Sequence, residues 1–137
     1  MNNEETIAYV KQFYADFLAC TDLPAFLEKY IVDEVVWENF LPSNIPFGGS
    51  FSGKAAYAEY LTILLQAIDM QQFDIDKIVV DGELVVIFGS ETSKVYATEL
   101  SYTMDWIHEL KIVDGMIVYA REYNDTAAMT IAFPPAG

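Results

Sequence analysis

The first part of the chain has hydrophobic residues at every third or fourth position, which is the period of a helix. This spacing predicts a first helix from about residue 3 to about residue 20, with Tyr14 on its apolar side. Thr21 or Asp22 is placed to cap a second, short helix, DLPAFLEKYI. Ser52 is placed to cap a third helix, GKAAYAEYLTILLQAI, after the loop LPSNIPFGGSFSG. We therefore expect three helices in the first half of the chain.

After the third helix the pattern changes to the alternation that is typical of strands. QFDIDKIVV and ELVVIFGSE flank Asp81-Gly82, and KVYATELSYTMDWIHELKIV and MIVYAREYN flank Asp114-Gly115, two signals for two-residue hairpin turns. VVWENF is strand-like, and TAAMTIAF forms either a final helical turn or coil. This order predicts an α+β fold. Three N-terminal helices would pack on a strongly curved sheet and enclose a cone-shaped, small-molecule pocket.

Length and composition narrow the choice of partners. The 137 residues suit one domain, 1–137, and 53% hydrophobic content is enough for a core. A net charge of −14 repels phosphate backbones and anionic lipid, so we expect neither nucleic acid nor membrane as a partner. Cys20 is the only cysteine, and the N-terminus lacks the features of a signal peptide, so a cytoplasmic location is expected. No metal-ligand spacing or nucleotide fingerprint is present, so no cofactor is expected.

The second hairpin contains the only histidine of the chain. A tight turn at Asp114-Gly115 would place His108 opposite Arg121, Trp106 opposite Tyr123, and Tyr119 on the same aromatic-rich face. We expect this face to line the pocket. Burial and a neighbouring cation both disfavour a protonated imidazole, so His108 is predicted to be neutral near pH 7. Arg121 would then hold a carboxylate or an enolate-like oxygen.

Simpler interpretations exist for the same residues. A lone inward histidine is often a hydrogen-bonded core residue, and Arg121 has local carboxylates, Glu38 or Asp125, with which to pair. The aromatic residues around the loop before the third helix are either pocket residues or core. These aromatic residues are Trp37, Phe40, Phe47 and Phe51.

Several stretches, taken in order, resemble a known family. They are YADFLACTDLPAFLEKY, DEVVWENF, IPFGGSFSGKAAYAEYL, VDGELVVIFG and WIHELKIVDGMIVYAREYND, which together cover nearly the whole chain. The chain resembles the SnoaL-like and ketosteroid-isomerase-like branch of the nuclear transport factor 2-like superfamily. The resemblance implies a cystatin-like cone, a barrel of curved antiparallel or mixed sheet against three helices, that usually dimerises through its sheet.

The resemblance also assigns roles to single residues. Tyr14, eight residues before Asp22, matches the tyrosine of the isomerases, and His108 falls where they carry an acid that stabilises an oxyanion. Asn39 stands where they have the aspartate base, and an amide cannot take and return a proton. Glu38, next to it, should point to the opposite side of the strand.

For the SnoaL-type cyclases, which use an aspartate on the sheet, Asp125 is the closest counterpart and Asp105 the second. Asp125 is also placed to cap the turn into TAAMTIAF. Two functions follow from the resemblance. One is a cofactor-free isomerase or cyclase acting on an apolar, polyketide- or steroid-like carbonyl compound, with Tyr14, His108, Arg121 and Asp125 as catalytic residues. Its ligand would touch Trp37, Asn39, Phe47, Phe51, Trp106, Tyr119 and Tyr123. The other is a non-catalytic ligand-binding or dimeric scaffold module.

Overall fold

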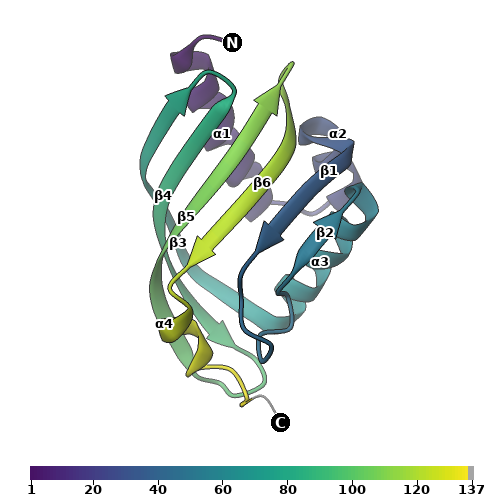
Figure 1. Ribbon diagram of the computed structural model, residues 1–137. Coiled ribbons are helices and arrows are strands. Elements are labelled where there is room, and N and C mark those ends of the chain that lie inside the picture. The colour runs from purple at the N-terminus through teal and green to yellow at the C-terminus, as the bar shows by residue number, and fades with distance from the viewer. Residues whose placement is uncertain (136–137) are drawn as a thin grey trace.

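The computed structural model describes residues 1–135; the last two residues of the predicted domain 1–137 lie outside them. The predicted α+β fold is confirmed (Figure 1). The helices are α1 (Asn3–Leu18), α2 (Leu23–Tyr30), α3 (Lys54–Ala67) and α4 (Thr126–Thr130). The strands are β1 (Ile31–Asn39), β2 (Ser50–Ser52), β3 (Ile68–Asp81), β4 (Leu84–Val95), β5 (Ser101–Val113) and β6 (Met116–Asn124).

The six strands form one mixed sheet in the order β2-β1-β6-β5-β4-β3. β1 runs parallel to β6, and the other neighbours are antiparallel. The sheet curls without closing, and α1, α2 and α3 lie behind it on its concave side (Figure 1). The core fills the space between these helices and the inner face of the sheet. Within residues 1–135, no helix is long and apolar enough to cross a membrane.

The helix starts follow local capping chemistry. Asn2 and Glu5 form a capping box at α1, and the Asp22 side chain accepts a hydrogen bond from the backbone N–H of Ala25 at α2. The predicted cap at α3 is wrong, because Ser52 pairs with Val36 as the last residue of β2 and Gly53 takes the cap position. The loop before α3 thus contains a short strand that its Pro, Gly and Ser content concealed.

The turns differ in detail from the prediction. Asp114-Gly115 forms the expected tight turn, with φ of 51° and 75°. The first hairpin turns one residue later than predicted, at Gly82-Glu83, because Asp81 pairs with Leu84. The long strand predicted from residue 94 is interrupted at residues 96–100, where Glu99 has a φ of 61°.

A β-bulge in β6 changes the face on which several predicted site residues lie. Ile112 pairs with Ile117 as predicted, but Lys111 then pairs with Tyr119, which leaves Val118 as an extra residue. His108 therefore pairs with Glu122, and the predicted pairing with Arg121 is wrong. Because side chains alternate along a strand, a slip by one residue exchanges the two faces of β6.

Candidate functional site

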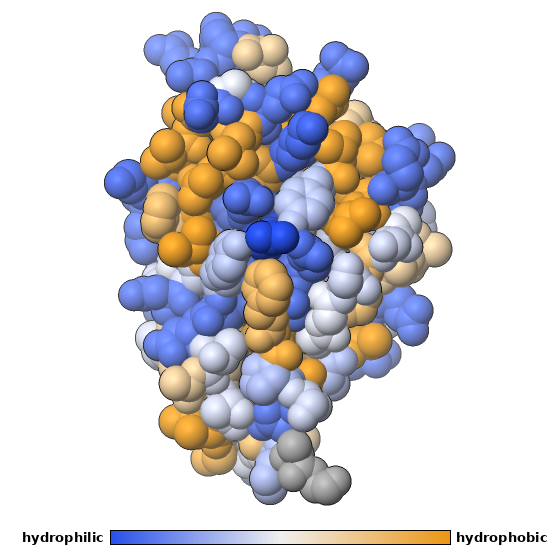
Figure 2. All heavy atoms as spheres, viewed as in Figure 1, coloured by the Kyte–Doolittle hydropathy of each residue, from blue (hydrophilic) through white to orange (hydrophobic). Residues whose placement is uncertain are grey.

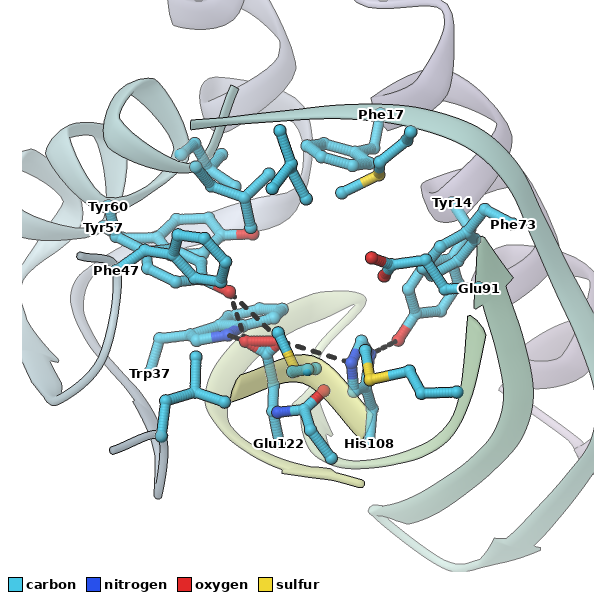
Figure 3. Close-up of a pocket in the computed structure, with 18 of the residues that line it drawn as sticks. Tyr14, Phe17, Trp37, Phe47, Tyr57, Tyr60, Phe73, Glu91, His108 and Glu122 are labelled. Atoms are coloured by element: carbon cyan, nitrogen blue, oxygen red, sulfur yellow. Dashed lines mark hydrogen bonds and ion pairs between the residues drawn. The ribbon is translucent and has the colours of Figure 1, made fainter. Parts of the chain in front are cut away.

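The helices and the concave face of the sheet enclose a cavity with mostly aromatic and aliphatic walls (Figure 3). Its free volume of about 50 Å³ holds a few water molecules or the reacting end of a larger ligand. Four ionisable or hydrogen-bonding side chains stand out on this apolar wall: Tyr14, Glu91, His108 and Glu122. Since polar groups in an apolar cavity fix and polarise a ligand, these four define the candidate site.

Tyr14, His108 and Glu122 form a continuous hydrogen-bonded chain from α1 to β5 and β6. The Tyr14 hydroxyl lies 2.7 Å from His108 Nδ1, and His108 Nε2 lies 3.2 Å from Glu122 Oε2. His108 and Glu122 are each 7% exposed, so water screens this chain little. The neighbour of His108 is therefore a carboxylate rather than the predicted cation.

Glu122 is held as a carboxylate by its surroundings. Burial alone would raise its pKa, but the charge of His108 and the hydrogen bonds that Glu122 receives hold the pKa below its ordinary value. Besides His108, the donors are the Trp37 indole N–H, at 2.9 Å from Oε1, and the Tyr60 hydroxyl. All three donors come from different elements, so the carboxylate also ties β1, α3 and β5 to β6.

Tyr14 keeps its proton at physiological pH. Burial raises the pKa of its hydroxyl well above the ordinary value, and the nearby Glu122 carboxylate adds to this rise. The hydroxyl is therefore a hydrogen-bond donor in the cavity rather than a base. Such a donor, in a site of low water content, is suited to stabilising negative charge on a ligand oxygen.

Trp106 supports His108 from behind. The two ring centroids are 4.3 Å apart, and Phe73 stacks on the indole at 4.7 Å. Gly89, opposite Trp106 in the sheet, has no side chain where the indole lies, and a Cβ there would meet it at 2.2 Å. Trp106, predicted as a ligand-binding residue, thus orients His108 and is not among the residues that line the cavity.

The other predicted residues on β1 and its loop fall into two groups. Trp37 and Phe47 line the cavity. Phe51 packs on Tyr60, with ring centroids 4.8 Å apart. The Asn39 amide makes three hydrogen bonds to the backbone: it donates to the Phe47 carbonyl at 3.0 Å, and Oδ1 accepts from two N–H groups of the same loop. Asn39 therefore shapes the loop rather than facing the cavity.

Arg121, Tyr119 and Tyr123, predicted to line the pocket, lie on the outer face of the sheet because of the bulge. Arg121 pairs with Glu38 at 2.9 Å, which is one of the local carboxylates expected from the sequence, and also donates to the Tyr123 hydroxyl. The Tyr119 hydroxyl and Arg121 together hold the pKa of Glu38 below its ordinary value. None of these three side chains lines the cavity.

Asp125 follows the end of β6 and caps α4. Its side chain accepts a hydrogen bond from the backbone N–H of Ala128 at 3.2 Å, which is the structural role anticipated beside the catalytic one. Asp105 is exposed on β5, beside the inward Met104 and Trp106. Neither aspartate lines the cavity.

Two carboxylates of the site, Glu91 and Glu122, were missed in the sequence. The alternation of Val85, Ile87 and Gly89 in β4 continues to Glu91, so strand phase alone could have placed Glu91 on the inner face. Glu122 had no such signal, since no glycine or other turn residue marks the bulge at Val118. Within residues 1–135, no three His, Cys, Asp or Glu side chains could together hold a metal ion.

The curled six-stranded sheet, the three covering helices and the enclosed cavity define a nuclear transport factor 2-like protein. The SnoaL-like domain model matches residues 10–120, and the chain therefore belongs to the SnoaL-like domain family. No curated protein matches the chain significantly.

Solved structures share this fold. A nuclear transport factor 2-like protein of Burkholderia xenovorans is 25% identical, with a TM-score of 0.86 over 98% of this chain and 99% of the other. A candidate SnoaL-like polyketide cyclase of Mesorhizobium loti is 19% identical, with a TM-score of 0.69 over 86% and 97%. TerC, co-crystallised with polyporic acid, is 22% identical, with a TM-score of 0.76 over 92% and 95%.

Proposed function

We propose that this protein is a cofactor-free isomerase or cyclase acting on a small, apolar carbonyl compound. The observation that carries this proposal is the buried chain from Tyr14 through His108 to Glu122 in an aromatic cavity. A carbonyl oxygen that gains negative charge during a proton shift would accept a hydrogen bond from the Tyr14 hydroxyl. The occurrence of a candidate SnoaL-like polyketide cyclase and of TerC, co-crystallised with polyporic acid, on this fold supports a small-molecule role.

The proton balance of the chain follows from its donors. Tyr14 has one proton, so when it donates to a ligand oxygen, His108 Nδ1 must donate to the Tyr14 oxygen. Glu122 Oε2, 3.2 Å from Nε2, holds the imidazole ring in the orientation that this hydrogen bond needs. Glu122 and His108 thus act as positioning residues behind Tyr14, the group that would touch the ligand.

Ligand entry requires side-chain movement. The free volume of about 50 Å³ is too small for a whole ring system. Phe17, Met70 and Phe73 line the cavity but are only half-buried, and they come from the end of α1 and the start of β3. We infer that the cavity opens between the end of α1 and the start of β3. The apolar body of a ligand would enter there by displacing these three side chains.

Tyr14→Phe tests the proposed oxyanion site. With 2-tetralone as an enolisable aromatic probe, we expect the wild type to accelerate exchange of the α-hydrogens for deuterium in D2O, followed by proton NMR. Loss of one donor to a developing oxyanion should slow this exchange by about 100-fold. Tyr96→Phe, a change at an exposed tyrosine outside the site, is the matched control. Equal rates for the two variants would contradict the role of Tyr14.

A second candidate function is a ligand-binding module without turnover. Asn39 favours it, because an amide tied to three backbone groups replaces the expected base. Calorimetry with 2-naphthol, whose oxygen resembles that of an enolate, separates the two functions. Binding that depends on Tyr14 without any 2-tetralone exchange would support the module.

The outer face of the sheet supports a homodimer. Five large hydrophobic side chains are exposed there, and Figure 2 shows hydrophobic surface gathered over β3, β4 and β5 on this side. They are Phe40, Val79, Leu84, Ile107 and Tyr123. A second copy packed against this face would cover them. The cytoplasmic location expected from the sequence stays a prediction.

A further inference from the structure

We propose that Glu91 moves the proton in this cavity, taking it from the carbon next to a carbonyl group that is held by Tyr14, the residue that His108 positions. This inference rests on the proposed function and supplies the proton carrier that it lacks. The candidates from the sequence do not fill that role, because Asn39 is an amide bound to its loop and Asp125 caps α4 outside the cavity. Glu91 is 6% exposed and lines the cavity together with Tyr14 and His108.

The position of Glu91 in β4 aims its carboxyl group into the open space. Its backbone pairs with that of Met104 on β5. Met104 and His108 are four residues apart and therefore point to the same side of the strand, so Glu91 and His108 both lie on the inner face. Figure 3 shows the carboxyl group pointing into the cavity, which Tyr14, His108 and Glu122 also line. A ligand carbon could therefore face Glu91 while its carbonyl oxygen faces Tyr14.

The hydrogen bonds of Glu91 leave one oxygen for a ligand. Ser93 Oγ and the Tyr102 hydroxyl both donate to Oε2, each at 2.8 Å. Oε1 accepts no hydrogen bond from the described residues. Glu122, by contrast, uses both oxygens for fixed donors. Buried polar atoms are normally paired, so a half-paired carboxyl in a cavity wall indicates a site for a ligand or a transferred proton.

The pKa values of Glu91 and Glu122 are shifted in opposite directions, upward for Glu91 and downward for Glu122. Burial raises the pKa of Glu91, and its bonds from Tyr102 and Ser93 and the charge of His108 only partly offset this rise, to which the Glu122 charge adds. Tyr57 and Tyr60, both on α3, also line the cavity and interact with the Glu122 charge. When the pKa values of two neighbouring carboxyl groups are shifted in opposite directions, the two groups take different roles. The group with the lowered pKa stays ionised, and the group with the raised pKa can take up and release a proton.

The reaction step balances without a co-reactant. Ionised Glu91 takes the α-proton through Oε1, and the C–H electron pair becomes the new C=C bond. The carbonyl π pair moves to oxygen, where the Tyr14 hydroxyl donates to it. Return of the proton from Glu91 to the same carbon, or to the far end of a conjugated system, restores both the carbonyl and the carboxylate. The substrate class is therefore an enolisable ketone with an apolar body.

Glu91→Gln keeps the shape of the side chain and its acceptors for Ser93 and Tyr102, but it cannot carry a proton. We expect 2-tetralone exchange to fall by about 100-fold or more, which is the usual contribution of a general base. Binding of 2-naphthol, which depends on Tyr14, should stay within about twofold. Glu83→Gln, in the exposed turn between β3 and β4, is the matched control and should exchange like the wild type.

Stability gives a second measurement that needs no substrate. A carboxyl group with a raised pKa in the folded state stabilises the fold at low pH and loses this contribution as pH rises above the reference value of 4.5. Gln does not titrate, so Glu91→Gln should melt at a higher temperature than the wild type at pH 8, with a smaller gap at pH 5. A purely structural Glu91 predicts the reverse, a variant that melts lower at both pH values.

The outcomes separate the two proposals. Exchange that Tyr14→Phe slows but Glu91→Gln does not would overturn the role of Glu91 and leave the proposed function standing. Wild-type protein that binds 2-naphthol without exchanging 2-tetralone would overturn both in favour of the binding module. Lower melting of Glu91→Gln at both pH values, with unchanged exchange, would make Glu91 a structural residue.

Discussion

Asn39, at the end of β1, is bound to the backbone of the following loop, although the resemblance to the isomerases implies a catalytic base at this position. Its amide donates to one backbone carbonyl and accepts from the N–H groups of Leu41 and Gly49. A carboxylate could accept the same two hydrogen bonds as Oδ1, but it could not donate the hydrogen bond that Nδ2 donates to the Phe47 carbonyl. The amide is therefore required by the loop, and the proposed isomerase would need its proton carrier elsewhere.

Asn39→Asp should consequently weaken the fold without creating a base. At pH 7 the carboxylate would lie next to the Phe47 carbonyl oxygen with no proton to donate, at a cost of about 1–3 kcal/mol in the free energy of unfolding. At pH 4 the protonated form can donate again, and the loss should shrink. Urea unfolding at both pH values measures this, with Asn3→Asp, in the exposed first turn of α1, as control. Equal loss at both pH values would argue against this hydrogen bond as the cause.

Strands and helices were predictable to different degrees from the sequence. Helical periodicity and the capping residues Asn2 and Asp22 determine α1 and α2 locally, so a reading of the sequence places them well. The faces of β6 depend on the bulge at Val118, which forms through pairing with β5 and carries no local mark. The existence of the long strands was therefore predictable, whereas the short β2 and the strand phase after the bulge were not. Tyr14 in α1 and His108 in β5 lie outside the bulged strand, and the sequence placed both inward correctly. Glu122 follows the bulge and was placed on the wrong face.

Gly89 in β4 offers a test at the level of strand pairing. A Cβ at this position would lie 2.2 Å from the Trp106 ring and 2.3 Å from the Asp74 carbonyl oxygen of β3. Because one of these neighbours is backbone, the strain has no cheap relief, and Gly89→Ala should cost about 3 kcal/mol or more in unfolding free energy. Denaturant unfolding measures it. Ser90→Ala, one residue further, should change stability by less than about 1 kcal/mol; similar losses for both would show that the close approach is unimportant.

The whole molecule combines a strongly negative charge with exposed hydrophobic side chains on the outer face of the sheet. Like charges oppose association, while burial of exposed hydrophobic side chains favours it. Arg121 and Glu38 neutralise each other at the centre of that face, which reduces the charge that a second copy would meet. The proposed dimer should therefore strengthen with added salt, which screens the remaining −14 charge of each chain.

Ile107→Lys tests the proposed dimer. Ile107 is 36% exposed on β5, and a lysine there would place two cations in the apolar contact. We expect the wild type to have twice the 15.5 kDa chain mass by light scattering and the variant to have one chain mass. Leu65→Lys, at an exposed position on α3 away from this face, should leave the mass unchanged. A wild-type protein with the mass of one chain would contradict the proposed dimer.

Both tryptophans of the chain contact the hydrogen-bonded pair that His108 and Glu122 form. The Trp37 indole donates to Glu122, and the Trp106 ring lies against His108. No third tryptophan exists to mask them, so the intrinsic fluorescence of the protein arises next to the site. The emission of the unlabelled protein is thereby a built-in optical reporter, which responds to any ligand or proton that changes the charge between these two rings.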